Sequence, residues 1–395
     1  MTRVDSPSPR VALLTYSTKP RGGVVHTLNL AEAMAALGVD VTVWSLARGG
    51  DAGFFREVDP AVTVRLVPFA DREGEDITAR IVRSIDTLRE AFEPDDYDIV
   101  HAQDCISANA VGTCIRTIHH LDEFTTPILV ECHEKAVLNP HARICVSKAV
   151  AAEVEDKWGL SPTVIPNGVA YQRFADAASD SAVAIGARRR WSDRLGEYVL
   201  AVGGIEPRKG SIDLLNAYAL LRERHRELTL VFAGGETLFD YRDYRADFDR
   251  RRAELDVEPI VLGNVPDDDL PSLVAACRVF AFPSVKEGFG LAAMEALSAG
   301  RPVVARELPI LREVFGDTVT YASTVPDLAH ALEAALTPDA TRVAAGRALA
   351  ASLTWEDAAR RHLEFYARHP TPGRNEIPRR SDPPHAAPTR ITGAR

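Results

Sequence analysis

The chain has 395 residues, of which 46% are hydrophobic and 26% charged, a composition typical of a globular protein with two domains. Its net charge of −10 argues against a broad nucleic-acid-binding surface, which needs many basic side chains, and leaves a local basic patch open. The five cysteines are scattered with no Cys-x-x-Cys pair, so they indicate reduced thiols rather than a zinc site or a disulfide framework.

The first part of the chain alternates apolar, strand-like runs with helical patterns. Strands are expected at residues 10–16, 39–46, 62–67 and 97–101, and helices at 24–37 and 77–92. A glycine-bearing loop, residues 17–23, separates the first strand from the first helix. Strands that alternate with helices indicate a parallel sheet covered on both faces.

The same alternation begins again after residues 176–190, which are rich in Ala, Ser and Asp, close with three arginines and are typical of an exposed linker. Strands are expected at residues 198–202, 228–233, 260–262, 279–282 and 302–305, with a helix at 211–225. Two doubly wound units leave a cleft between the carboxyl ends of their strands, where ligands of such folds bind. A last helix is predicted at 355–369, and disorder at residues 1–9 and in the Pro- and Arg-rich tail 370–395.

The most informative motif is E-G-F-G-L-A-A-M-E, residues 287–295, which connects a strand-like run to a helix-like run. Gly288 and Gly290 allow close backbone approach to a ligand, and the helix N-terminus offers unpaired N–H groups to an anion. Glu287 on the turn and Glu295 within the helix can reach different parts of that ligand. Two glutamates at this spacing also occur on ordinary solvated helices, but the glycines and flanking strands favour a ligand carrying phosphate and hydroxyls, such as a nucleotide sugar.

Over residues 10–368 the chain resembles the retaining glycosyltransferases of the family-4 type, which have the GT-B fold. The further motifs that carry this resemblance are P-R-G-G-V at 20–24, D-I-V-H-A-Q-D at 98–104, R-T-I-H-H at 116–120, V-I-P-N-G-V at 164–169, V-G-G-I-E-P-R-K-G at 202–210, F-A-G-G at 232–235, L-G-N-V-P at 262–266 and G-R-P-V-V at 300–304. Each motif is weak alone, but nine in the family's order are difficult to reach by chance.

The resemblance implies an α/β protein of GT-B architecture, with two Rossmann-like domains facing a central cleft. The implied division is an acceptor-side domain at residues 1–175, the linker 176–190, a donor domain at 191–352, a helix near 353–369 that packs back on the first domain, and the tail.

The resemblance also implies a donor site for a nucleotide-diphosphate sugar. Lys209 and Arg208 would bind the diphosphate, since Lys offers a compact charge and Arg a planar fork. Many relatives carry arginine where this chain has Gly204, and Arg208 is the candidate to supply that charge. An exposed basic pair at a helix start is the alternative, although the helix dipole disfavours cations there.

The remaining implied donor contacts are mainly backbone groups and carboxylates. The backbone at Val265 would pair with the base, Glu295 would accept bonds from the ribose, and Glu287 would contact the donor sugar. Backbone N–H groups would meet the phosphates and sugar at Gly22, Gly23, Phe289, Gly290 and Leu291.

Histidines identify the expected acceptor side of the cleft. His119 matches the histidine that relatives place beside the donor sugar and the acceptor, with His120 as its neighbour. His133, taken to lie at a similar strand end, is the competing candidate. His101 and Asp104 are expected to line the cleft and orient the acceptor, although both could equally be structural.

We interpret the chain as a retaining glycosyltransferase of the hexosyltransferase type, with His119, Lys209, Arg208 and Glu287 as catalytic groups. Family members are thought to react on one face of the sugar, with the leaving phosphate taking the acceptor's proton, so Glu287 is not assigned as a nucleophile. No cofactor or metal is expected, because Asp247-Phe248-Asp249 fits a solvated helix face better than a metal site.

Three alternatives stay open at this point. A sugar-nucleotide epimerase shares the architecture and would form product from the nucleotide sugar alone. A non-catalytic sugar-nucleotide binding protein is disfavoured by the intact glutamate and lysine positions. A nicotinamide dehydrogenase would need a G-x-G-x-x-G at the first helix, and no clean example occurs.

The resemblance also implies which partners the protein binds. The donor is expected to be UDP-, GDP- or ADP-linked, and the acceptor an unidentified sugar, lipid or small molecule. Residues 54–55, 71–76 and 121–126 are expected to select it. The absence of an apolar run of about 20 residues and of a signal-peptide core favours a cytoplasmic protein. The helix at 77–92, with three arginines, could contact a membrane surface, but an ordinary surface helix is the simpler interpretation.

Overall fold

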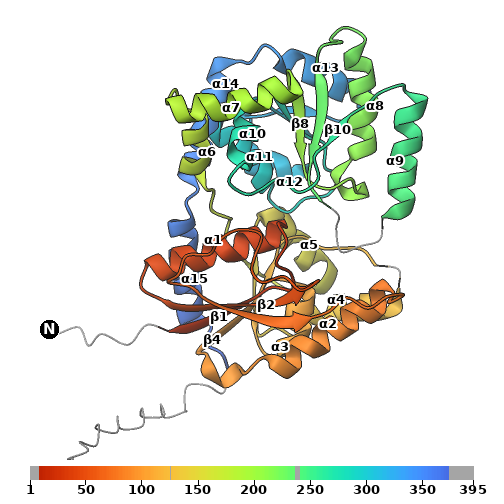
Figure 1. Ribbon diagram of the computed structural model, residues 1–395. Helices are drawn as coiled ribbons and strands as arrows, with labels where there is room; N and C mark the ends of the chain where they lie inside the picture. The colour runs from red at the N-terminus through yellow and green to blue at the C-terminus, as the bar shows by residue number, and fades with distance from the viewer. Residues whose placement is uncertain (1–8, 125, 236–240, 373–395) are drawn as a thin grey trace, which may run out of the picture.

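The computed structural model describes residues 9–124, 126–235 and 241–372, and it contains two parallel β-sheets flanked by helices (Figure 1). The strand order is β3-β2-β1-β4-β5-β6-β7 in the seven-stranded sheet and β10-β9-β8-β11-β12-β13 in the six-stranded sheet. Two doubly wound units confirm the predicted α/β class. Residues 1–8 and 373–395, which the sequence predicts to be disordered, lie outside the described residues.

The first sheet consists of β1 (Arg10–Leu14), β2 (Asp40–Arg48), β3 (Thr63–Phe69), β4 (Ile99–Ala102), β5 (Ile115–Ile118), β6 (Ala142–Cys145) and β7 (Thr163–Val164). Its helices are α1 (Gly22–Ala36), α2 (Ile77–Ala91), α3 (Cys105–Val111), α4 (Pro127–Leu138) and α5 (Lys148–Trp158). A short 3-10 turn, η1 (Pro94–Asp96), precedes β4.

The second sheet consists of β8 (Tyr198–Val202), β9 (Thr229–Ala233), β10 (Ile260–Val261), β11 (Val279–Phe282), β12 (Val303–Arg306) and β13 (Thr320–Ala322). The helices of this half are α6 (Tyr171–Ala177), α7 (Ala182–Leu195), α8 (Ser211–Arg222), α9 (Arg242–Glu254), α10 (Leu270–Ala276), α11 (Leu291–Ser298), α12 (Pro309–Phe315), α13 (Val325–Ala335) and α14 (Ala340–Ser352). The 3-10 turn η2 (Pro207–Lys209) follows β8, and α15 (Trp355–Arg368) ends the described chain.

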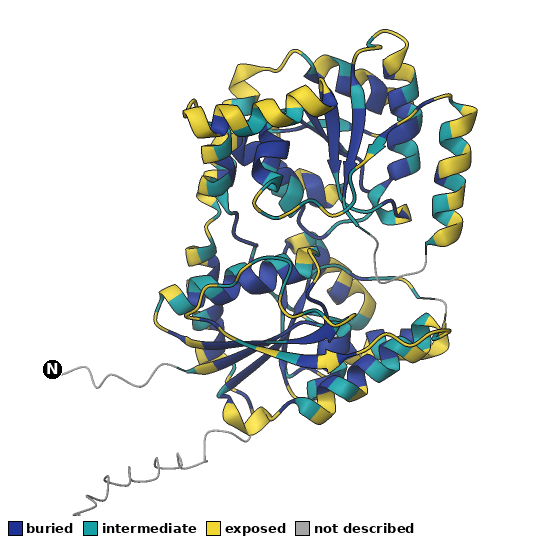
Figure 2. Ribbon diagram, viewed as in Figure 1, coloured by how far each residue is buried: buried dark blue, intermediate teal, exposed yellow. Residues whose placement is uncertain are grey.

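Central strands are apolar on both faces because helices cover both faces of each sheet. Strand β1 pairs with β2 on one side and β4 on the other, and its residues 11–14 have no exposed surface. Figure 2 shows the same pattern across the molecule, with buried strands inside and exposed outer faces on the helices.

Helix α15 returns from the second half of the chain and packs against α1. Its residues Ala359, Phe365 and Tyr366 are buried in the core of the first sheet. Thr354 caps the helix by accepting a hydrogen bond from the backbone N–H of Asp357 at 3.0 Å. The last helix therefore couples the two halves of the chain.

Residues 176–190, predicted to be an exposed linker, are mostly exposed and lie largely in helices α6 and α7. Ser181 caps α7 through its hydroxyl, and Trp191 of α7 donates a hydrogen bond to the Ser272 hydroxyl of α10 at 2.9 Å. The alanines and arginines that suggested a linker are also strong helix formers, so a capped and packed helix results.

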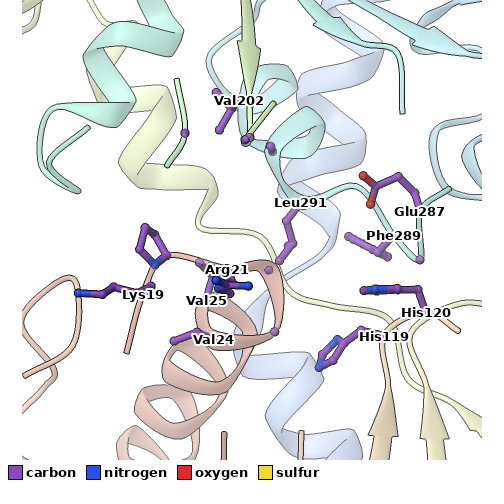
Figure 3. Close-up of a pocket in the computed structure, with 18 of the residues that line it drawn as sticks. Lys19, Arg21, Val24, Val25, His119, His120, Val202, Glu287, Phe289 and Leu291 are labelled. Carbon is purple, nitrogen blue, oxygen red and sulfur yellow. The ribbon is translucent and has the colours of Figure 1, made fainter. Parts of the chain in front are cut away.

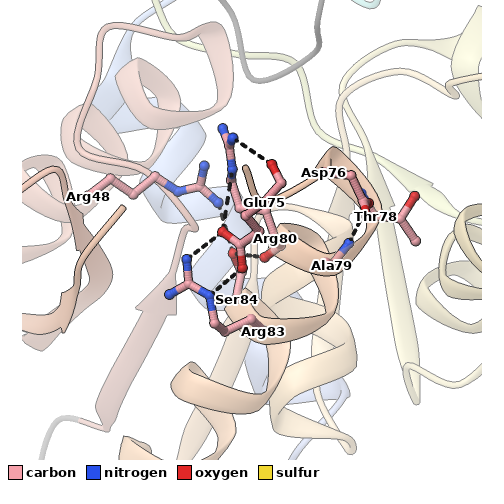
Figure 4. Close-up of polar contacts among 8 residues, drawn as sticks. All are labelled: Arg48, Glu75, Asp76, Thr78, Ala79, Arg80, Arg83 and Ser84. Atoms are coloured by element: carbon pink, nitrogen blue, oxygen red, sulfur yellow. Dashed lines mark hydrogen bonds and ion pairs between the residues drawn. The ribbon is translucent and has the colours of Figure 1, made fainter. Parts of the chain in front are cut away.

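Helix α2 is held by a local charge cluster at its start (Figure 4). Asp76 caps the helix by accepting two backbone hydrogen bonds from its first turn. Glu75 accepts two 2.6 Å bonds from Arg83 and lies 3.8 Å from the Arg80 guanidinium. Two of the arginines that suggested a membrane-facing helix are thus paired within the protein.

In the described part of the chain, no helix has both the length and the apolarity needed to span a bilayer.

Candidate active site

A cleft of about 1540 Å³ lies between the carboxyl ends of the two sheets. Loops after β1, β4 and β5 line one side, and loops after β8, β9 and β11 line the other. Figure 3 shows Lys19 and His119 from the first side and Glu287 and Phe289 from the second. Thirteen of the fourteen candidate residues line this cleft: Gly22, Gly23, Asp104, His119, His120, Arg208, Lys209, Val265, Glu287, Phe289, Gly290, Leu291 and Glu295.

The centre of the donor half is an ion cluster around Glu287. Its Oε1 accepts hydrogen bonds from Lys209 Nζ at 2.6 Å and from an Arg208 guanidinium nitrogen at 3.1 Å. Burial alone would raise the pKa of Glu287, but the two cations bring it to about 2, so the carboxylate is ionised. Gly210 permits this arrangement, since it has a φ of 64° and a Cβ there would lie 2.3 Å from the Pro283 carbonyl oxygen.

The glycine turn before α11 brings the two halves of the cleft into contact. A Cβ on Gly288 would lie 1.5 Å from the backbone oxygen of His119. Gly290 caps α11 with a φ of 95°, and a Cβ there would lie 2.8 Å from the Phe315 ring. The α11 N-terminus therefore faces the cleft beside Glu287, where its N–H groups can bind an anion.

Glu295 lies one turn into α11, beside the ion pair of Arg173 and Asp267, whose charged atoms are 2.6 Å apart. Burial raises the pKa of Glu295 to about 8, with Arg173 opposing the rise and Asp267 adding to it. Val265 also lines the cleft. The corner around Glu295 therefore offers a carboxyl group to a polar ligand with hydroxyls.

His119 lies on the opposite wall, against the glycine loop that begins α1. Its ring is 3.5 Å from the position of a Cβ on Gly23, and its centroid is 4.7 Å from that of His26. Burial, together with the charge of Arg116, lowers the pKa of His119 well below its ordinary value, so the imidazole is neutral. Its Nε2 has no hydrogen-bond partner among the described residues.

His101 is the candidate that the structure contradicts. It is fully buried and does not line the cleft. Its Nδ1 is 2.7 Å from the Tyr366 hydroxyl of α15, and its Nε2 is 2.7 Å from the Thr117 hydroxyl. The prediction failed because α15, more than 250 residues away in sequence, covers this strand end.

The other acceptor-side candidates lie at the cleft, but not all are free to bind. Asp104 caps α3 and also accepts a 2.9 Å hydrogen bond from the backbone N–H of Tyr16. His120 pairs with Asp122 at 3.2 Å. His133 lines the cleft from α4 rather than from a strand end, and burial lowers its pKa to about 4.

Several cleft residues were not identified from the sequence. Arg116 and Gln103 are buried at its floor, and Lys19, Arg21 and Arg173 line its walls. The sequence feature that could have identified Arg116 is a charged residue inside the apolar run of β5.

Asp247 and Asp249 lie on the solvent-exposed side of α9 and pair with Arg250 and Arg252, which confirms the predicted helix face.

Two protein-family models match the chain. The model described as Glycosyltransferase Family 4 matches residues 20–173, and the model described as glycosyl transferases group 1 matches residues 192–348. A D-inositol 3-phosphate glycosyltransferase from Kribbella flavida is 30% identical, over 92% of this chain and 96% of that protein. The O-antigen chain mannosyltransferase B of Escherichia coli is 36% identical, over 43% of this chain and 45% of that protein.

Solved structures show the same fold. The sucrose-phosphate synthase from Thermosynechococcus elongatus has a TM-score of 0.74 and 19% identity, covering 91% of this chain and 98% of that chain. Anabaena HepE, solved in complex with UDP-glucose, has a TM-score of 0.69 and 19% identity, covering 91% of this chain and all of that chain. These likenesses confirm the GT-B architecture.

Proposed function

This chain belongs to the group 1 glycosyltransferases of the family-4 type, and from that premise we propose that it moves a sugar from a nucleotide-diphosphate sugar to an acceptor hydroxyl with retention of configuration. The observation that carries the proposal is the Glu287 ion cluster beside the α11 N-terminus, opposite His119. Two largely buried cationic side chains beside a helix N-terminus suit a leaving diphosphate, whose charge increases in the transition state.

In the proposed donor complex the diphosphate lies between Lys209, Arg208 and the α11 N-terminus. The amides of Gly22 and Gly23 approach it from the first half. Arg208 supplies the positive charge that relatives place at Gly204, since its guanidinium reaches Glu287 at 3.1 Å. These groups stabilise the diphosphate without a divalent metal, so transfer should persist in a chelator.

The nucleoside lies at the Glu295 corner in this proposal. The backbone at Val265 pairs with the base, and Glu295 accepts hydrogen bonds from the ribose hydroxyls. The side chains there do not favour one base on chemical grounds. UDP is the first candidate because it is bound in the Anabaena protein of the same fold.

Transfer then proceeds on one face of the sugar. The bond from C1 to the diphosphate oxygen breaks, a bond from C1 to the acceptor oxygen forms, and the acceptor proton passes to the leaving phosphate. Neutral His119, with Nε2 lacking a partner among the described residues, hydrogen-bonds the sugar rather than acting as the base. Contact between the two halves at Gly288 helps to exclude water.

A thermal-shift screen against UDP, GDP and ADP tests the donor site, because a ligand that binds only the folded state raises the melting temperature. We expect one diphosphate to stabilise the protein, and Lys209→Ala or Glu295→Ala to abolish that shift. Lys135→Ala is the matched control, since Lys135 is exposed and pairs with Glu131 outside the cleft. Absence of a shift with all three diphosphates would refute the proposal, and the anomeric configuration of the product, measured by NMR, tests retention.

A further inference from the structure

A buried arginine without a carboxylate partner lies on the acceptor-side floor of the cleft. Arg116 belongs to β5, is 8% exposed and lines the cleft. Its Nε and one terminal nitrogen are buried with no hydrogen-bond partner among the described residues. A guanidinium keeps its charge under all ordinary conditions, and a buried charge without a partner is costly.

A second buried polar group accompanies it. Gln103 follows β4, the strand that pairs with β5, and its side chain is 1% exposed and also lines the cleft. Neither the oxygen nor the nitrogen of its carboxamide has a partner within the described residues. Buried polar side chains are normally satisfied, so Arg116 and Gln103, which both line the cleft, are each candidates to bind a ligand.

The neighbouring carboxylate of Asp104 does not pair with Arg116. Burial raises the pKa of Asp104, and the charge of Arg116 acts to lower it. The oxygens of Asp104, however, already accept hydrogen bonds from Tyr16 and Ser107. No ion pair within 4 Å joins Asp104 to Arg116 in the described structure. His133 faces the same floor as a neutral ring, because burial lowers its pKa to about 4.

We propose that Arg116 forms a subsite for an anionic group, a carboxylate or a phosphate, on the acceptor. The guanidinium would donate two hydrogen bonds to the anion. The inference deepens the proposed function and rests on it, because it names the chemical class of the acceptor.

The spacing to the reaction centre is consistent with this subsite. Arg116 and His119 are three residues apart on β5 and its loop, which at about 3.3 Å per extended residue is roughly 10 Å. An acceptor held by its anion at Arg116 could therefore present a hydroxyl near His119, as a sugar with a charged substituent would.

Binding of inorganic phosphate and of malonate tests the proposal without knowledge of the acceptor. We would measure thermal shifts for the wild type, Arg116→Met and Lys209→Ala, with chloride at equal ionic strength as the reference. One of the two anions should stabilise the wild type and Lys209→Ala, and its dissociation constant should rise roughly 10- to 100-fold in Arg116→Met, as expected for a charge-assisted bond. The preferred anion distinguishes phosphate from carboxylate.

Arg143→Met is the matched control, because Arg143 lies opposite Arg116 on the neighbouring strand β6 but donates to the backbone carbonyls of Val137 and Leu138. It should keep the anion shift. Ligand-free Arg116→Met should melt no lower than the wild type, since an apolar side chain replaces an unpaired charge.

The results separate this inference from the proposed function. Equal anion shifts in the wild type and Arg116→Met, no shift in the wild type, or a shift lost only in Lys209→Ala would overturn the subsite while leaving the donor site standing. Loss of all nucleotide shifts, with the Arg116-dependent anion shift retained, would instead overturn the donor assignment.

Discussion

Replacing Glu287 by Gln tests the electrostatics of the donor half, because it removes one negative charge and keeps the shape of the side chain. Glu287 is 10% exposed, and its pKa falls from an ordinary 4.5 to about 2. At 1.36 kcal/mol per pKa unit, that difference corresponds to about 3 kcal/mol of stability at neutral pH. For a domain of this size the loss predicts a melting temperature about 6–12 °C lower.

The same substitution should strengthen binding of a nucleoside diphosphate. Without that carboxylate, Lys209 and Arg208 lose their shared partner, and Arg208 keeps Glu206 at 3.9 Å as a carboxylate partner, so both cations are more available to phosphate oxygens. The predicted signature is a less stable ligand-free protein with a larger thermal shift for the diphosphate, together with slower sugar transfer.

The stability that Glu287 contributes should decrease in acid. The folded-state pKa of Glu287 lies below the unfolded-state value, so its contribution is complete above pH 4.5 and is lost as the pH falls toward 2. Melting curves of the wild type and Glu287→Gln should therefore converge in acid. Glu131→Gln, an exposed partner of Lys135, is the control and should melt like the wild type. If Glu287→Gln also melts like the wild type and binds diphosphate no more tightly, the reasoning is wrong.

Three further predictions concern single positions. Burial lowers the pKa of His362 to about 4, so between pH 6.5 and about 4 the unfolded chain takes up a proton that the folded protein does not, and stability should fall; His362→Gln should make that part of the melting profile less steep. Because the pKa of Glu295 is about 8 and the proposal needs its carboxylate, diphosphate affinity should rise between pH 7 and 9, and Glu295→Gln should abolish the rise, as titration calorimetry can measure. Gly288→Ala should slow transfer by about 100-fold, because its Cβ would lie 1.5 Å from the His119 oxygen and force the halves apart. Gly186→Ala, where a Cβ meets nothing within 4 Å, should leave the rate unchanged.

Much of the site could be predicted because its residues follow strands. In a parallel sheet the carboxyl ends of neighbouring strands meet at one edge, so glycines and charges just after apolar runs converge there. Gly22, Lys209 and Glu287 follow this rule, and all three line the cleft. The α/β class followed from the same alternation of strands and helices.

The sequence by itself therefore determined the two doubly wound units and which loops meet at the cleft, since both depend on local periodicity and strand order. Only the tertiary structure decided which side chains at those loops are accessible. His101 lies outside the cleft because α15 covers it, and its Nδ1 contacts the Tyr366 hydroxyl, 265 residues away in sequence. Arg116 was left without a carboxylate because Asp104 is occupied by backbone and serine donors. Burial and pairing arise from elements distant in sequence, and the local pattern does not encode them.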